Sequence, residues 1–363
     1  MGAVRTRLAE SRDRDALIEF IRDHWSARHV FVSDPDVFDW QYRQADGRIN
    51  MMMAEDVAED GHATVLGVLG FIPTGRFDPD LGDADILLAL WKVREDIAPP
   101  GLGLRLLKAI QAQLKPRMIG AIGITDAVGP IYRALGYTLD RLSQAAIVNP
   151  AFKGRTRLAQ GVPEAAFAKG AVDTTRSLCK LDPQRDSDVV AVLAGRCCPQ
   201  KSWAYIRERY IDHPWYDYDL RFVLHDGRPE ALLVWRSVEA EGARILRIVD
   251  SIGSTGWLPS GTALLRPVLT EAAAEYIDIM GCGLSAENLQ AGGFISPEWC
   301  DGLILPNYFA PFEAKNIRIA LSWKRFDGAA GADAMCLFRA DSDQDRPNQP
   351  LPRRTAGSGQ AAV

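Results

Sequence analysis

The spacing of apolar positions in the first part of the chain changes from helical to strand-like. Apolar residues at helical spacing behind Ser11, a common helix-capping residue type, predict a helix over 12–24. Short apolar runs at 49–54, 65–72 and 86–93 are separated by turns that contain Gly, Asp or Pro. This pattern predicts an opening helix followed by an antiparallel meander of three strands.

The pattern changes again after Val93. A Pro- and Gly-rich loop at 99–103 leads directly into leucines and an isoleucine that share one helical face up to Leu114. A short apolar run at 118–124 predicts a strand, and 126–135 predicts a helix that ends at Gly136. We expect a last strand at 145–148 to close this first unit.

Aromatic residues and histidines are dense between 24 and 43, where Asp34-Pro35-Asp36 interrupts the pattern. This segment predicts a loop or a broken helix. Its rings could form the wall of a ligand pocket or could be half-buried packing, and the sequence leaves both alternatives open.

The second half repeats the order of elements with different residues. An aromatic helix at 204–210, strands at 221–224, 231–235 and 244–252, a helix at 262–276 and a strand at 277–282 follow one another. The prediction is an α/β (α+β) fold of tandem domains, each a largely antiparallel sheet flanked by helices, with the second degenerate. We expect domains at 1–150 and 151–340 and a disordered tail at 341–363; the alternative is an unrelated α+β second domain.

Composition and charge narrow the classes of function. The 363 residues are 47% hydrophobic and 25% charged, as in ordinary globular proteins, and 42 Lys and Arg against 47 Asp and Glu give a net charge of −5. An acidic chain lacks the basic excess of most nucleic-acid binders. No apolar stretch suggests a membrane span or a signal peptide, and six cysteines without a CxxC pair or zinc spacing predict reduced thiols in the cytoplasm and no metal.

The loop that contains Gly101 and Gly103 carries the strongest chemical signal. Glycines allow backbone N–H groups to approach a ligand, and the N-terminus of a helix adds a partial positive charge, so the two together can bind a pyrophosphate. A tight turn without a ligand is the alternative. The preceding strand and the following helix favour phosphate binding.

These residues resemble the GNAT superfamily of acyl-CoA-dependent N-acyltransferases. Val93 matches the end of the family's long strand, Gly101 and Gly103 match its pyrophosphate loop, and 131–137 matches its late helix, whereas Ala98 and Pro99 depart from the loop pattern. The resemblance implies acetyl-CoA or another acyl-CoA as cofactor. The residues implied to bind it are Trp91, Val93, Gly101, Leu102, Gly103, Leu104 and Tyr132.

The chain also resembles a narrower group, the two-domain GNAT enzymes that acylate nucleotide-linked amino sugars in bacterial surface-polysaccharide pathways. The residues that carry this likeness lie at 24–29, 38–41, 66–73 and 91–93. The implied acceptor is a small molecule with a free amine, and neither a nucleic acid nor a membrane is the expected partner. A homodimer is left open.

Acyl transfer to an amine needs a base, an oxyanion site and an acid for the thiolate. Tyr132 lies where the family has its general acid, with packing under the loop as the alternative. His29 is the candidate base because its ordinary pKa suits neutral pH, although a structural histidine fits equally well. Asp85, with Asp83 beside it, could deprotonate the amine through water or could belong to a solvated turn.

Five residues are candidate contacts to the acceptor: His29, Trp40, Gln41, Tyr210 and His213. Trp40 and Trp91 could stack on a ring or could belong to the core. Two rival functions remain: a tandem-GNAT aminoacyl transferase that uses charged tRNA, disfavoured by the acidic charge, and a non-catalytic ligand-binding protein, favoured by Ala98.

Overall fold

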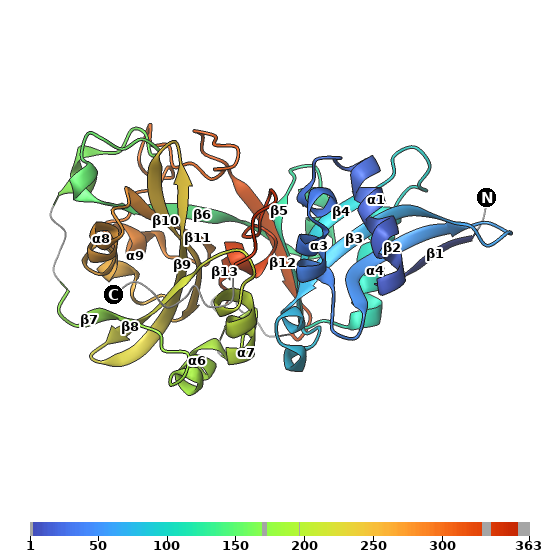
Figure 1. Cartoon of the computed structure of the whole chain (residues 1–363), viewed down its shortest axis with the longest axis horizontal. Coiled ribbons are helices and arrows are strands. Elements are labelled where there is room, and N and C mark those ends of the chain that lie inside the picture. The colour runs from blue at the N-terminus through green and yellow to red at the C-terminus, as the bar shows by residue number, and fades with distance from the viewer. Residues whose placement is uncertain (1–2, 169–172, 196, 329–334, 355–363) are drawn as a thin grey trace. The chain divides into compact units, whose positions relative to one another are not determined.

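The computed structural model describes residues 3–168, 173–195, 197–328 and 335–354 (Figure 1). The chain divides into two compact units. The first contains Met1–Leu139, Leu321–Ala329 and Ser342–Pro352, and the second contains Asp140–Ala320, Ala330–Asp341 and Arg353–Val363. Each unit therefore draws on segments that are far apart in the sequence.

The first unit is built on a mixed sheet with the order β1-β2-β3-β4-β5-β12, to which β12 contributes from Leu321 onward. The strands are β1 (Ala3–Glu10), β2 (Arg48–Val57), β3 (Ala63–Pro73), β4 (Asp85–Val93), β5 (Met118–Ile124) and β12 (Ile319–Arg325). Neighbouring strands from β1 to β4 are antiparallel, and β4 is parallel to β5. The predicted meander is therefore present.

Helices of the first unit follow from local sequence signals. Their bounds are α1 (Arg14–His24), α2 (Val30–Ser33), α3 (Pro35–Tyr42), α4 (Leu102–Leu114) and α5 (Gly129–Ala134). The apolar face of α4 is buried against the sheet through Leu106, Leu107 and Ile110. Helix α4 begins after Gly101 and ends before Lys115, and both flanking residues have left-handed backbone conformations that end regular helix geometry.

The second unit has the sheet order β6-β11-β10-β9-β8-β7, with β13 paired to β11. Its strands are β6 (Thr138–Val148), β7 (Arg176–Lys180), β8 (Asp219–His225), β9 (Arg228–Ala240), β10 (Ala243–Gly253), β11 (Tyr276–Cys282) and β13 (Leu337–Phe338). Its helices are α6 (Ser187–Ala194), α7 (Trp203–Ile206), α8 (Gly261–Glu271) and α9 (Ala286–Ala291). A meander, a helix and a parallel strand thus recur in the predicted order.

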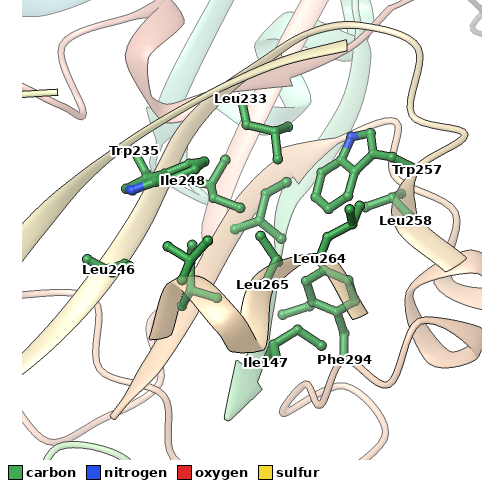
Figure 2. Close-up of a cluster of buried hydrophobic side chains, with 14 of the residues drawn as sticks. Ile147, Leu233, Trp235, Leu246, Ile248, Trp257, Leu258, Leu264, Leu265 and Phe294 are labelled. Carbon is green, nitrogen blue, oxygen red and sulfur yellow. The ribbon is translucent and has the colours of Figure 1, made fainter. Parts of the chain in front are cut away.

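The core of the second unit lies between α8 and the sheet. Figure 2 shows Leu264 and Leu265 of α8 among side chains of β9 and β10, with Trp257 and Phe294 beside them. Trp257 is fully buried, and its indole N–H donates to the hydroxyl of Ser251 at 3.2 Å. The loop after β10 is consequently part of the core of this unit.

Three expected boundaries differ from the structure. Strand β6, expected to close the first unit, pairs with β11 from Ser143 to Val148 and belongs to the second. The helix expected over 262–276 ends at Glu271, and Tyr276 begins β11. The helix expected over 126–135 begins at Gly129.

The described part of the expected disordered tail is packed. Asp341, Ser342 and Asp345 are buried, and Arg354 donates to the carbonyl oxygens of Ile211 and His213. Disorder is therefore wrong for 341–354, because buried polar contacts fix a segment that has almost no apolar side chains. The remaining positions, 355–363, lie outside the described residues.

Candidate active site

Strands β4 and β5 diverge within the sheet of the first unit. Their pairing runs from Asp85 and Met118 to Leu88 and Ala121, whereas β4 continues to Val93 and β5 to Ile124. A register shift in the β3–β4 pairing lies at the same level, between Leu69 and Phe71. Past Leu88, the edge of β4 that would face β5 is released from this pairing, so its backbone N–H groups can serve a ligand.

The first turn of α4 follows this opening along the chain. Gly101 is exposed, has φ of +79°, and has open space where a Cβ would lie, so the turn favours glycine through its backbone conformation alone. A Cβ at Gly103 would lie 3.1 Å from the indole nitrogen of Trp91, which shows how closely the helix approaches β4. The early N–H groups of a helix lack intrahelical acceptors and attract anions.

Tyr132 lies next to Trp91 and belongs to α5. The two rings meet edge to face with centroids 6.2 Å apart, and Tyr137 packs on the other side at 5.1 Å. Burial, together with the nearby Tyr137, raises the pKa of Tyr132 well above its ordinary value. Tyr132 therefore stays protonated at neutral pH, the state that a proton donor needs.

The predicted cofactor residues come together in the first unit. Trp91 and Val93 lie at the end of β4, Gly101 to Leu104 form the first turn of α4, and Tyr132 contacts Trp91. Ala98 is half-buried against the same core as α4. These residues therefore lie around the end of β4 and the first turn of α4.

His29 does not have the geometry of a general base. Its Nδ1 accepts the backbone N–H of Phe31 at 3.2 Å and caps α2. A neutral imidazole has one acceptor nitrogen, so Nε2 carries hydrogen and can only donate. Burial and the positive charge of Arg346 lower the pKa of His29 to about 4. The structural interpretation is therefore favoured over the base.

Asp85 is also unsuited to the role of base. Its carboxylate is fully buried and pairs with Arg117, whose Nε lies 3.0 Å from Oδ1. It begins β4, and Val93, eight residues on, lies about 26 Å away in an extended strand. The Asp85 carboxylate thus lies at the end where β4 and β5 are paired, away from the opening. Asp83 beside it is bound by Arg48 at 2.7 Å.

Trp40 and Gln41 lie on α3 and are buried. Trp40 is 8% exposed and packs on Phe77 with ring centroids 5.6 Å apart, and Gln41 is 1% exposed. Trp40 therefore belongs to the core, which was the alternative to stacking on a ring of the acceptor. Gln41 has no direct access to solvent in this conformation.

Tyr210 and His213 have intramolecular partners in the second unit. The hydroxyl of Tyr210 donates to Asp250 at 2.5 Å, and Nδ1 of His213 accepts the backbone N–H groups of Trp215 and Tyr216. Both side chains are almost fully buried. Their expected contact with the acceptor is not supported, because these polar atoms form hydrogen bonds within the protein.

The position in the second unit that corresponds to the opening is filled. Pairing of β10 with β11 runs only from Leu246 to Ile248, and β13 then pairs with Gly281 and Cys282 of β11. Lys201 lies beside this insertion and binds Asp250 at 2.6 Å and Asp341 at 2.8 Å. The three side chains are at most 3% exposed.

The helix terminus that follows β10 is occupied as well. The backbone N–H and the hydroxyl of Thr262, in the first turn of α8, both donate to the carbonyl oxygen of Gly292. A Cβ at Gly261 would lie 2.2 Å from the ring of Phe294. Both features explain why a phosphate loop is absent from this half of the sequence.

The sequence analysis missed a segment of the site, Ser342–Pro352, which belongs to the first unit. The guanidinium of Arg346 lies over the ring of Phe31 at 4.7 Å. A Cβ at Gly123 of β5 would lie 3.0 Å from Nε2 of Gln344. Hydrophobic periodicity could not reveal this segment, because charged and amide side chains make its contacts.

Three further findings concern metal ions, membrane spans and cysteines. Within the described ranges, no cluster of three or more His, Cys, Asp or Glu side chains could hold a metal ion. No helix among those residues has the length and apolar character needed to cross a bilayer. All six cysteines are free thiols.

Comparisons with known proteins identify the fold. No protein-family model and no curated protein sequence matches the chain. The structure of a GCN5-related N-acetyltransferase from Anabaena variabilis ATCC 29413 has a TM-score of 0.54 at 10% identity, over 89% of this chain and 73% of that one. Another from Kribbella flavida has a TM-score of 0.49 at 13% identity, over 90% of this chain and 71% of that one. The likeness to the Anabaena structure shows that this chain has a GNAT-like fold.

Proposed function

We propose that the protein is an acyl-CoA-dependent N-acyltransferase that acts at the first unit. The observation that carries this proposal is the divergence of β4 from β5 past Leu88, beside the exposed Gly101 turn of α4. The released edge of β4 offers N–H groups to a pantetheine chain and to a thioester oxygen. The turn at α4 offers N–H groups and a helix dipole to the pyrophosphate.

The side chains around the opening suit direct attack by an amine on the thioester. Backbone N–H groups at the end of β4 would stabilise the oxyanion of the tetrahedral intermediate. Tyr132, kept protonated by burial, would give its proton to the departing CoA thiolate. This assignment requires no covalent acyl-enzyme.

For the acceptor, we propose the amine of a nucleotide-linked amino sugar, which would receive an acetyl or a short acyl group. The proposal rests on the resemblance carried by residues 24–29 and 38–41. In the structure, Trp25 is 48% exposed, and its ring lies 6.4 Å from that of His29. An exposed indole can stack on the apolar face of a sugar or on a base.

The cofactor site can be tested by thermal unfolding with acetyl-CoA. A ligand at 100 times its dissociation constant stabilises the folded state by about 2.7 kcal/mol. Gly101→Glu should abolish the rise in Tm, because it places a carboxylate and a strained side chain in the anion-binding turn. Gly227→Glu is the matched control, since Gly227 has φ of +76° and equally open space in the second unit. An equal rise in both variants would contradict the assigned site.

The acceptor can be tested by measuring acetyl transfer to a panel of amines. The panel contains UDP-linked amino sugars, polyamines and peptides with free N-termini, and CoA release is followed for each. We expect the highest kcat/KM for a nucleotide-linked amino sugar. Turnover of peptides alone would refute the proposed acceptor, and acetyl-CoA binding without any turnover would favour a ligand-binding protein.

A further inference from the structure

The reaction proposed above needs a group that takes a proton from the acceptor amine, and neither His29 nor Asp85 can do so. Several shielded carboxylates of the first unit are engaged by arginines at 2.6–3.0 Å. These pairs are Asp13 and Glu55 with Arg7, Asp39 with Arg14, and Asp83 with Arg48. They serve to hold the fold together. Asp343 lies in the segment that was expected to be a disordered tail. Its surroundings differ from those of these four carboxylates.

Contacts on two sides place the Asp343 segment at the open end of the β4–β5 pair. Its neighbour Gln344 lies against Gly123, which follows the last paired residue of β5, Ala121. On the other side, Arg346 lies over Phe31, whose ring contacts that of Tyr42 with centroids 5.6 Å apart. Asp343 directly precedes Gln344 in the chain, so it lies at the same end of the β4–β5 pair.

Tyr42 connects this segment to the meander. A Cβ at Gly70 of β3 would lie 3.0 Å from the Tyr42 hydroxyl, so the phenol lies directly on the strand next to β4. Burial and the negative charge of Asp343 raise the pKa of Tyr42 well above its ordinary value. The carboxylate is therefore near the level of the sheet at which β4 leaves β5.

The carboxylate of Asp343 differs from the four arginine-bound carboxylates in its pairing with arginine, and not in its exposure. Its side chain is 17% exposed. A guanidinium nitrogen of Arg346 lies 3.8 Å from the carboxylate, and the amide of Gln344 donates to Oδ1 at 3.3 Å. This loose pairing contrasts with the close arginine contacts of the structural carboxylates. It leaves acceptor capacity on the oxygens for an N–H group of the substrate amine.

We propose that Asp343 is the general base of the first-unit site, an inference that rests on the N-acyltransferase function. As the amine nitrogen forms its bond to the thioester carbonyl carbon, an N–H proton passes to the Asp343 carboxylate, directly or through one water. The C–S bond then breaks, and the sulfur receives the Tyr132 proton. Asp343 releases its proton to solvent and Tyr132 is reprotonated, so that the products are the amide and CoA thiol.

The test compares acetyl transfer from acetyl-CoA to a UDP-linked amino sugar by the wild type, Asp343→Asn and the control Asp301→Asn. Asp301 is exposed in the second unit. General base catalysis predicts a kcat about 10²–10⁴-fold lower in Asp343→Asn, with an unchanged rise in Tm on addition of acetyl-CoA. Sodium formate should restore part of the rate of Asp343→Ala, because a small carboxylate can occupy the vacated place.

Two results would overturn the assignment: a kcat of Asp343→Asn within about threefold of the control, or an Asp343→Ala variant that formate leaves unchanged. Should Asp343→Asn lose the response to acetyl-CoA, Asp343→Glu decides between base and structural residue. Asp343→Glu keeps the carboxylate. If Asp343 is the base, this variant should retain more turnover than Asp343→Ala, and equal loss of turnover in both variants would refute the assignment. Absence of transfer by the wild type to every amine of the panel would instead overturn the proposed function.

Discussion

Lys201 provides a stringent test of the buried charge cluster in the second unit. Its ammonium nitrogen lies 2.6 Å from Asp250 and 2.8 Å from Asp341, and none of the three side chains has appreciable solvent exposure. Lys201→Met keeps most of the side-chain volume but removes the cation. Two carboxylates then remain buried without it.

The expected loss of stability follows from the burial of these charges. Removing one partner of a buried ion pair costs about 3–5 kcal/mol. For units of this size, each kcal/mol lowers Tm by about 2–4 °C, so Tm should fall by about 6–20 °C. Lys180→Met, at an exposed position of the same unit, is the control and should leave Tm nearly unchanged.

The pH dependence gives an independent check. Burial raises the pKa of Asp341 to about 6, above the value of about 3.9 for an unfolded Asp. The folded state therefore binds this proton more tightly, and stability increases as the pH falls from about 6 to about 4. Without the Lys201 cation, the pKa of Asp341 rises further, so the variant should be less destabilised at pH 5 than at pH 8. Urea unfolding at both pH values measures this. A loss of stability below about 1 kcal/mol, or a larger loss at pH 5 than at pH 8, would show that Lys201 does not stabilise these buried carboxylates.

Two further substitutions separate catalysis from structure. Tyr132→Phe should lower kcat about 10²–10⁴-fold and keep the acetyl-CoA-induced rise in Tm, since only the proton donor is lost; unchanged kcat would exclude Tyr132 as the acid. Asp85→Asn should lower stability by about 1–3 kcal/mol through its contact with Arg117, with kcat/KM within about twofold of wild type below the Tm; selective loss of kcat would restore Asp85 as a catalytic candidate.

Local sequence patterns predicted much of the first unit. Short apolar runs and turn residues located β2, β3 and β4, and the apolar face of α4 with Gly101 before it located the glycine turn. Each of these signals depends on residues that are close in sequence. Pairing between distant segments was not predictable in the same way: β6 joins β11 and β12 completes the first sheet, and no single strand specifies its neighbour.

The candidate site was predicted unevenly for the same reason. Most of the residues proposed to bind the cofactor lie along β4 and the first turn of α4, so a local motif could suggest them. The role of His29 depends on a backbone hydrogen bond from Phe31, and that of Asp85 on Arg117, 32 positions away. The Asp343 segment reaches Gly123 and Phe31 through polar contacts, which leave no hydrophobic pattern in the sequence.

We propose that the first unit alone binds acyl-CoA, between the end of β4 and the first turn of α4. Isothermal titration with acetyl-CoA tests it most directly, because it reports both affinity and the number of sites. We expect one site per chain, lost in Gly101→Glu and retained in Gly227→Glu, since β13 and the packed α8 terminus fill the equivalent place in the second unit. No binding, or one site that survives Gly101→Glu, would contradict it.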